Sequence, residues 1–76
     1  MDIRIGVSET PREITMALAA DTDRNEVKDA VAAALAGASD TLWLVDDKGR
    51  DIAIPAAKIA YVELGPDSDI NPIGFG

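Results

Sequence analysis

Cysteine and histidine are both absent from the 76 residues of this chain. Disulfide bonds cannot form, and a nucleophile activated by histidine cannot be assembled, which removes the Ser–His and Cys–His classes of enzyme. A zinc site is disfavoured as well, because carboxylates alone suit harder cations. We therefore expect a protein that is not an enzyme and carries no cofactor. The lack of cysteine also fits a reducing compartment.

Basic residues are scarce, with seven Lys and Arg against 14 Asp and Glu. The formal net charge is −7 and the isoelectric point is near 4.2. Nucleic-acid binding depends on cations that neutralise phosphates, so we expect no nucleic-acid partner and no attraction to anionic membranes. We attribute the acidity to solubility rather than to recognition of a basic partner.

Long apolar runs are missing too. The longest nearly apolar stretch, residues 31–38, is too short and too rich in alanine to span a bilayer. The first residues, Met1-Asp2-Ile3-Arg4, enter an alternating pattern at once, without the basic and apolar regions of a signal peptide. We expect no membrane insertion and a cytoplasmic location.

The patterns that are present begin with two alternating segments. Apolar residues at 3, 5 and 7, and again at 14, 16 and 18, predict two strands joined by a turn at residues 8–11. Residues 12–20 also contain Met, Leu and Ala, which favour a helix. We prefer a strand there because the period is two.

A helix is predicted over residues 24–36. Asp23 and Glu26 have the spacing of a capping box, and Gly37 suits the left-handed position after a helix. Apolar residues then recur on one stripe of an amphipathic helix: Val27, Ala30, Val31, Ala34 and Leu35.

Three further strands follow the helix. Residues 41–45 lead into a turn at residues 46–49, a return strand ends at Pro55, and a last strand covers residues 58–64. On that strand Ile59 and Tyr61 are expected to share one face, opposite Ala60, Val62 and Leu64. The order β-β-α-β-β-β predicts the α+β class: a small, mostly antiparallel sheet with one amphipathic helix on one face. Residues 1–65 form the single domain and residues 66–76 a C-terminal tail.

Residues 42–45 and 59–64 are apolar on both predicted faces, and such strands are normally buried on both sides. A single helix covers only one face of the sheet, so the tail, a second copy of the chain or a different protein must cover the other. Aromatic and apolar side chains in these segments and in the tail are therefore the predicted partner interface: Trp43, Tyr61, Val62, Leu64 and Phe75.

Few residues suggest chemistry. Asp46 and Asp47 stand beside Asp51, but a turn is wet, and we interpret them as solvated turn residues rather than a catalytic pair. Residues 67–71 offer oxygens at alternate positions, as a calcium loop does, but the sixth position is proline instead of glycine. No phosphate-binding loop is present. Basic side chains that could contact an anion are Lys48, Arg50 and Lys58.

Several stretches together resemble a family of small acidic actinobacterial proteins classed as a domain of unknown function (number 3107). They are Ile3-Arg4-Ile5-Gly6-Val7, Pro11-Arg12-Glu13, Lys48-Gly49-Arg50, Ile54-Pro55, Lys58-Ile59-Ala60-Tyr61-Val62-Glu63 and Ile73-Gly74-Phe75-Gly76. The resemblance implies a cytosolic actinobacterial protein and brings no catalytic residues. Some members carry a loose ATP-binding label, which the missing phosphate loop does not support.

Two functional hypotheses follow. The first is a non-enzymatic interaction or regulatory protein that self-associates or is a subunit of a larger assembly. The alternative is a small-ligand or nucleotide-binding module, in which the three basic residues named above contact the anion. An enzyme that uses carboxylates alone would need a buried Asp or Glu with a raised pKa, and we place this hypothesis last.

Overall fold

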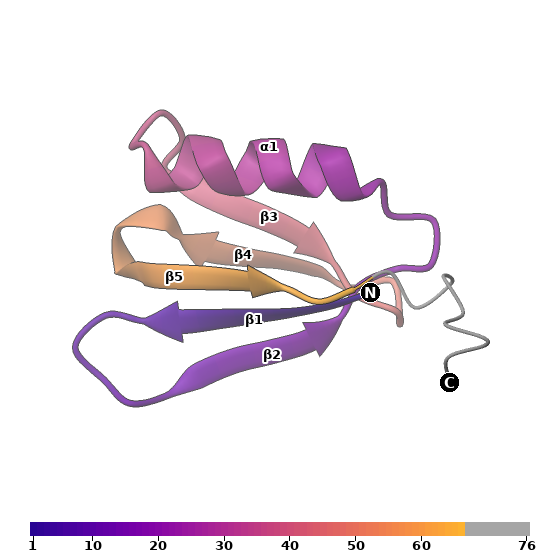
Figure 1. Ribbon diagram of the computed structural model, residues 1–76, viewed down its shortest axis with the longest axis horizontal. Coiled ribbons are helices and arrows are strands. Elements are labelled where there is room, and N and C mark those ends of the chain that lie inside the picture. The colour runs from indigo at the N-terminus through magenta and orange to yellow at the C-terminus, as the bar shows by residue number, and fades with distance from the viewer. Residues whose placement is uncertain (67–76) are drawn as a thin grey trace.

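A computed structural model describes residues 1–66 of the chain, and its elements follow the predicted order (Figure 1). The strands and the helix are β1 (Asp2–Val7), β2 (Glu13–Ala17), α1 (Arg24–Leu35), β3 (Thr41–Val45), β4 (Asp51–Pro55) and β5 (Ile59–Leu64), with a short 3-10 turn, η1 (Ala56–Lys58), between β4 and β5. The fold is α+β, as the sequence predicts.

The five strands form two antiparallel sheets that meet at one corner. One sheet has the order β2-β1-β5, and the other is the β3–β4 hairpin. Beyond the end of β2, Leu18 forms an isolated bridge with Asp46, beyond the end of β3. The backbone N–H of Asp47 donates to the carbonyl of Ala17 at 2.9 Å, and that of Ala19 donates to the carbonyl of Val45 at 3.1 Å. The hairpin is therefore fixed to the three-stranded sheet at its turn end.

The second segment is a strand and not a helix, as its period of two predicts. β2 pairs with β1 so that Ile14 lies opposite Ile5 and Met16 lies opposite Ile3. Ile3 and Ile5 are fully buried, and Ile14 and Met16 pack against them. The apolar face of the β1–β2 hairpin thus forms one wall of the core, and burial there outweighs the helix propensity of the isolated segment.

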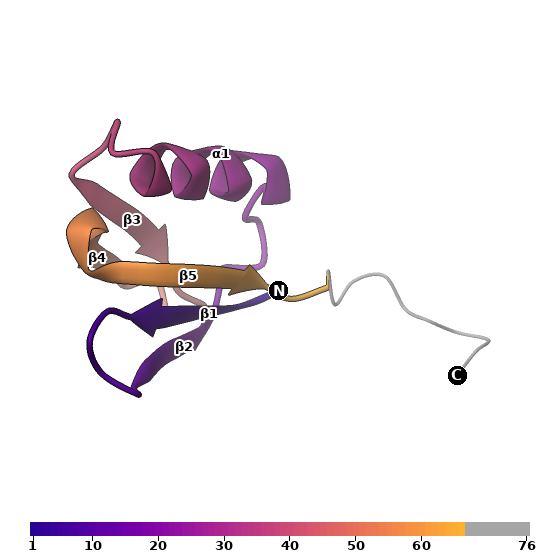
Figure 2. The same ribbon diagram turned by 60° about the vertical axis from the view of Figure 1, so that its left-hand side comes forward.

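Helix α1 lies on the β3 side of the molecule, opposite the β1–β2 hairpin (Figures 1 and 2). The carboxylate of Asp23 accepts hydrogen bonds from the backbone N–H groups of Asn25 and Glu26, which confirms the predicted N-cap. Gly37 follows the helix with φ of 80°, the left-handed conformation predicted for it.

The predicted apolar stripe of α1 is largely confirmed, and it meets a core built from both sheets. Val27 and Ala34 are buried, and Ala30 and Val31 pack against the core. Leu35 is the exception, since 52% of it is exposed. The buried residues of the core are Ile3, Ile5, Leu18, Val27, Ala34, Leu42, Leu44 and Ile54.

A β-bulge changes the faces of β5. Gly6 of β1 pairs with Tyr61, but Val7 pairs with Ile59, so Ala60 is an extra residue on the β5 side. Because one inserted residue shifts the alternation, Ile59 packs against the core together with Val62 and Leu64. The prediction that Ile59 and Tyr61 share a face is therefore wrong.

The alternation along β3 yields a stability prediction. Leu44 is buried in the core, whereas the adjacent Val45 is 43% exposed on the other face. Leu44→Ala should lower the free energy of unfolding by about 2–5 kcal/mol, since it removes buried methyl groups and leaves a cavity. Val45→Ala should change it by only about 0.5 kcal/mol. Urea denaturation of the dilute variants measures both values, and equal losses would contradict the assigned faces.

Candidate functional site

The outer face of the β3–β4 hairpin exposes large apolar side chains. Leu42 and Leu44 of β3 point into the core, so the residues between and after them point outward. Trp43, the only tryptophan of the chain, is 64% exposed, and Val45 is 43% exposed. We expected residues 42–45 to have a second apolar face that α1 does not cover. Within residues 1–66 this is so, because Trp43 and Val45 are exposed.

Side chains of β4 extend this exposed surface. Across the hairpin, Trp43 lies directly opposite Ala53. Two positions away along the hairpin in each direction, Thr41 pairs with the exposed Pro55 and Val45 pairs with the exposed Asp51. Directly paired residues of antiparallel strands share one face. The surface, hereafter the hairpin face, consists of Thr41, Trp43, Val45, Asp51, Ala53 and Pro55.

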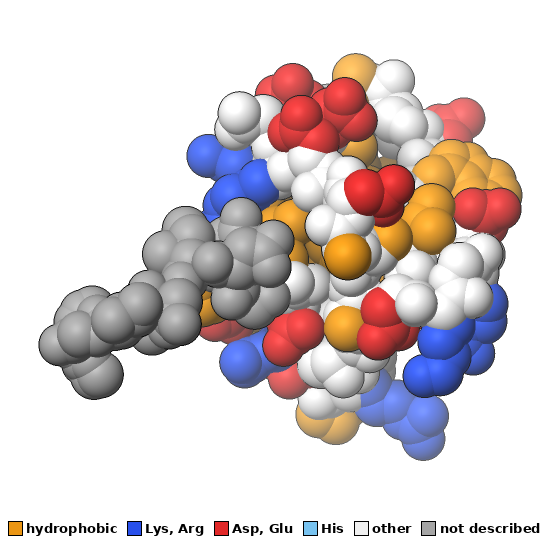
Figure 3. Space-filling view, turned by 90° about the vertical axis from the view of Figure 1, so that its right-hand side faces the viewer, with side chains coloured by type: hydrophobic (Ala, Val, Ile, Leu, Met, Phe, Trp, Pro, Cys, Tyr) orange, Lys and Arg blue, Asp and Glu red, His pale blue; other side chains and the backbone are white. Residues whose placement is uncertain are grey.

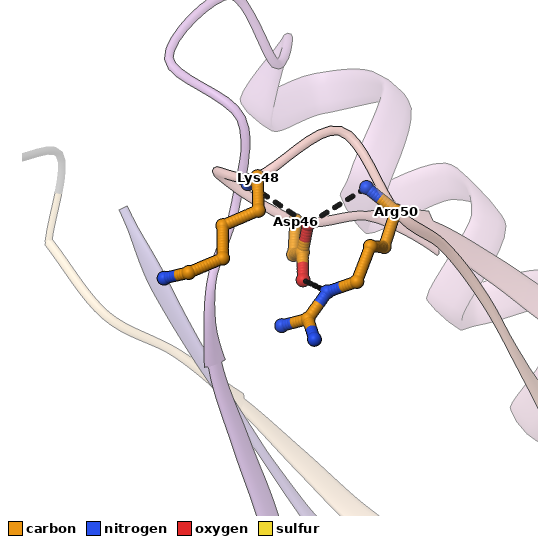
Figure 4. A network of polar contacts seen from close by, with 3 residues as sticks. All are labelled: Asp46, Lys48 and Arg50. Atoms are coloured by element: carbon orange, nitrogen blue, oxygen red, sulfur yellow. Dashed lines mark hydrogen bonds and ion pairs between the residues drawn. The ribbon is translucent and has the colours of Figure 1, made fainter.

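The turn that ends this hairpin is held by the carboxylate of Asp46 (Figure 4). One carboxylate oxygen accepts from the backbone N–H of Lys48 at 2.9 Å and from that of Arg50 at 2.8 Å. The other accepts from Nε of Arg50 at 2.6 Å. The carbonyl of Asp46 also accepts from the N–H of Gly49, whose φ is 78°. The sequence Asp46-Asp47-Lys48-Gly49 thus makes the predicted turn, with glycine at the left-handed position.

Burial separates Asp46 from its neighbour Asp47. Asp46 is 2% exposed because it sits where β2 and β3 meet, whereas Asp47 is exposed. The interpretation of both as solvated turn residues is therefore wrong for Asp46. The hydrogen bond from the Arg50 backbone N–H lowers the pKa of this carboxyl below its usual value, although burial acts in the opposite direction. A carboxylate held ionised in this way serves as a structural acceptor.

The basic side chains predicted to contact an anion do not converge. Lys48 and Arg50 lie at the β3–β4 turn, whereas Lys58 ends η1 at the opposite end of β4 (Figure 1). In Figure 4 the Lys48 side chain extends away from Asp46, whereas the Arg50 guanidinium forms an ion pair with the Asp46 carboxylate. These three residues therefore do not build one anion site.

Tyr61 lies on a different surface from Trp43. It is 45% exposed on the outer face of the three-stranded sheet. The Tyr61 ring lies across Gly6 of β1, so closely that a side chain at this position would collide with the ring. Its hydroxyl donates to a carboxylate oxygen of Glu13, and this bond raises the pKa of the phenol.

Charged residues surround Tyr61 on the same sheet face. Arg4 Nε lies 3.4 Å from a carboxylate oxygen of Glu63 and 4.0 Å from one of Glu13. The outer side of β5 thus carries Tyr61 and Glu63 in a polar setting. The expectation that residues 59–64 are apolar on both faces is wrong for this strand, because the bulge moved Ile59 to the inner face.

Val62 and Leu64 lie on a third surface, apart from those of Trp43 and Tyr61. They face α1 and line a shallow groove of about 300 Å³ between the helix and β5, together with Arg24, Lys28, Val31, Ala32 and Leu35. The five predicted interface residues therefore do not form one surface, since Trp43, Tyr61 and the Val62–Leu64 pair lie apart, and Phe75 lies outside the described residues.

The net charge of the segment that contains the hairpin is close to zero. Figure 3 views the end of the molecule that lies at the right of Figure 1, and it shows acidic side chains spread around a central hydrophobic area, with basic side chains at the left and the lower right. Residues 40–58, which build the hairpin and η1, hold four acidic and three basic residues, a formal −1 of the −7 on the chain. The net charge of this segment is low because its basic residues nearly balance its acidic ones.

Metal-site and membrane signals are both absent from the described residues. Over residues 1–66, no three carboxylates gather as metal ligands would. In the same range, no helix combines the length and the apolar character needed to cross a membrane. Residues 67–71, whose spacing of oxygens was compared with that of a calcium loop, lie outside the described residues.

Sequence reasoning missed two parts of the hairpin. Val45 alternates with Trp43, so the period of two could have placed both on one face, and the turn pairing could then have added Ala53 and Pro55. No local signal marks the burial of Asp46, because it depends on the contact with Leu18, 28 positions earlier.

Comparison with known families gives one match. A family model described as "Protein of unknown function (DUF3107)" matches residues 1–76, which confirms the resemblance to this domain of unknown function. No curated protein matches the chain.

The Asp46 cap predicts a pH-dependent stability. The pKa of Asp46 is lower in the folded than in the unfolded chain, so its carboxylate stabilises the fold above the ordinary aspartate pKa of about 3.9. That contribution is lost as the pH falls through the lowered pKa of the folded state. Asp46→Asn should therefore be less stable than the wild type at neutral pH, and the difference should shrink in acid.

The free energy of unfolding, measured by urea denaturation across the acid range, tests this. Asp47→Asn, on the exposed neighbour, is the matched control and should stay close to the wild type at neutral pH. A wild-type advantage over Asp46→Asn that is unchanged in strong acid would contradict the charged cap.

Proposed function

The chain belongs to this family of unknown function, DUF3107, and we propose that it is a non-enzymatic interaction protein that makes its contact through the hairpin face. It self-associates or serves as a subunit of a larger assembly. The observation that carries the proposal is the 64% exposure of Trp43 beside other apolar groups of the same face. Exposed contiguous apolar surface is typical of interaction sites, and tryptophan is enriched among the residues that contribute most binding energy.

The Asp46 cap supports this proposal. Three hydrogen bonds to its carboxylate fix the turn, and the pairing with Leu18 fixes the hairpin to the rest of the fold. A surface that is rigid before binding loses less conformational entropy when a partner docks. The hairpin face therefore has both the composition and the preorganisation of a docking surface.

The absence of an enzymatic role is part of the proposal. Asp46 is the buried carboxyl among the described residues, and its pKa is lowered rather than raised. Its oxygens are already occupied by the turn, so it is poorly suited to donate or accept a proton in a reaction. We place the protein in the actinobacterial cytoplasm, because the lack of cysteine fits a reducing compartment and the sequence resemblance points to that group.

A charge on the hairpin face tests the proposal. Ala53→Arg places a cation beside Trp43, and Ala60→Arg places the same side chain on the exposed bulge of β5. We expect wild type and Ala60→Arg to retain the same bound proteins from a native lysate, further copies of the chain included, and Ala53→Arg to lose them. Affinity capture with mass spectrometry measures this. Retention of the same proteins by Ala53→Arg would contradict a role for this face.

The nucleotide-binding alternative makes an opposite prediction. A ligand that binds the folded state raises the melting temperature by mass action. Because the three basic residues are spread over both ends of β4, we expect no shift with ATP, GTP or inorganic phosphate at millimolar concentration. A thermal-shift series measures this, and a shift abolished by Lys48→Ala or Lys58→Ala would restore the alternative.

A further inference from the structure

The groove between α1 and β5 leaves part of the apolar surface of the helix uncovered within residues 1–66. Its apolar lining comes from Val31, Ala32 and Leu35 of the helix and from Val62 and Leu64 of the strand. Leu35, the residue that ends α1, is 52% exposed. An apolar occupant of this groove would remove these side chains from water.

The same groove contains two cations and no carboxylate. Arg24 is the first residue of α1 and Lys28 follows one turn later, so both lie toward the start of the helix, and the apolar residues lie toward its end. Within residues 1–66 neither cation forms an ion pair with a carboxylate. The groove therefore fits an occupant with acidic groups first and apolar groups after them.

The described part of the chain ends beside the start of this groove. Nη1 of Arg24 donates to the carbonyl of Gly65 at 2.6 Å. Figure 1 shows the end of β5 and the start of α1 at the same end of the molecule. Gly65 is followed by Pro66, and this dipeptide is typical of turns. A reversal at this point would direct the following residues back along the groove.

The sequence of residues 67–76 has the order of side chains that the groove requires. Two aspartates come first, and three large apolar residues follow them. These five residues are Asp67, Asp69, Ile70, Ile73 and Phe75. Acidic residues would therefore meet the cations at the start of the helix, and apolar residues would meet the apolar lining toward its end.

The length of this segment is sufficient. From Arg24 to Leu35 the helix rises about 17 Å, at roughly 1.5 Å per residue. Nine extended residues, 67–75, span about 30 Å. The segment can therefore reach the far end of the groove and still make the reversal.

We propose that residues 67–76 dock in the α1–β5 groove of the same molecule. The two aspartates then lie beside the two cations, and Phe75 lies beside Leu35. Attachment through Gly65 favours this occupant over a free peptide, because a short tether gives an effective concentration on the order of millimolar. The inference goes beyond the proposed function and is independent of it, since the hairpin face is a different surface. An acidic and apolar peptide of another protein could enter the groove only by displacing the segment.

A paramagnetic label in this segment measures the contact. Because the chain has no cysteine, Gly76→Cys provides a single site for a nitroxide, which broadens the NMR signals of nearby backbone amides. In the full nitrogen-labelled chain we expect the strongest broadening at residues 33–37, at the far end of the groove from Gly65. Broadening confined to residues near Gly65 would overturn the inference.

A mixture of two samples distinguishes the molecule's own segment from that of a second copy. Chains that carry the nitroxide but no nitrogen label are mixed with nitrogen-labelled chains that carry no nitroxide. We expect no broadening at residues 33–37 in this mixture. Broadening there as strong as in the doubly labelled chain would mean that a second copy supplies the occupant, and would overturn docking within one molecule.

Charge reversal in the groove tests the acidic contact. Lys28 is exposed, so Lys28→Glu should keep the fold. It should weaken docking about threefold, the effect of losing one exposed ion pair, and the broadening at residues 33–37 should fall. Lys48→Glu, the same substitution at the exposed β3–β4 turn, is the matched control and should leave the broadening unchanged. Adding Asp69→Lys to Lys28→Glu should restore it.

A variant of the segment itself keeps the test decisive if Lys28→Glu is poorly folded, which the same spectra would show. Phe75→Ser changes no residue of the groove and removes the largest apolar side chain of the segment. We expect it to reduce the broadening at residues 33–37. Broadening as strong in Phe75→Ser and in Lys28→Glu as in the original sequence would overturn the inference.

Discussion

The ionised carboxylate of Asp46, buried at the corner between the two sheets, is the interaction on which the rest of the structure depends. It accepts two backbone N–H groups and the Arg50 side chain, and its residue bridges to Leu18. In this one place the β3–β4 turn is closed and the hairpin is joined to the three-stranded sheet. A buried charge is tolerated only when it is paired and hydrogen-bonded, and each of its bonds fixes part of the turn.

That constraint accounts for the contrast between the two outer sheet faces. The hairpin is fixed at its turn and covered by the core on its inner side, so the outward positions of β3 present Trp43 and Val45 to solvent. On the three-stranded sheet, the outward Tyr61 ring instead lies across Gly6 and bonds to Glu13. On the three-stranded sheet Tyr61 therefore has partners within the chain, whereas on the hairpin Trp43 is available for a contact with another molecule.

Local signals predicted most of the fold and only part of the site. Asp23 and Gly37 mark the two ends of the helix, because helix caps involve only neighbouring residues. The period of two in apolar residues identified the strands. The bulge at Ala60 could not be foreseen, because it arises from pairing between β1 and β5. Trp43 was identified from its apolar neighbours, whereas the burial of Asp46 requires knowledge of which strand ends meet. Contacts distant in sequence account for each of the errors.

The most direct test of this account is the set of backbone amide chemical shifts of the nitrogen-labelled chain, followed by NMR from dilute to concentrated solution. Every described residue except Met1 and the prolines has a backbone amide that can be followed, so the contact surface is located without any substitution. The account predicts that the changes concentrate in β3, β4 and the turn between them, and that the Trp43 indole N–H moves with them. Changes centred on the α1–β5 groove or around Tyr61 would contradict it, and no change at any concentration would exclude self-association through the hairpin face.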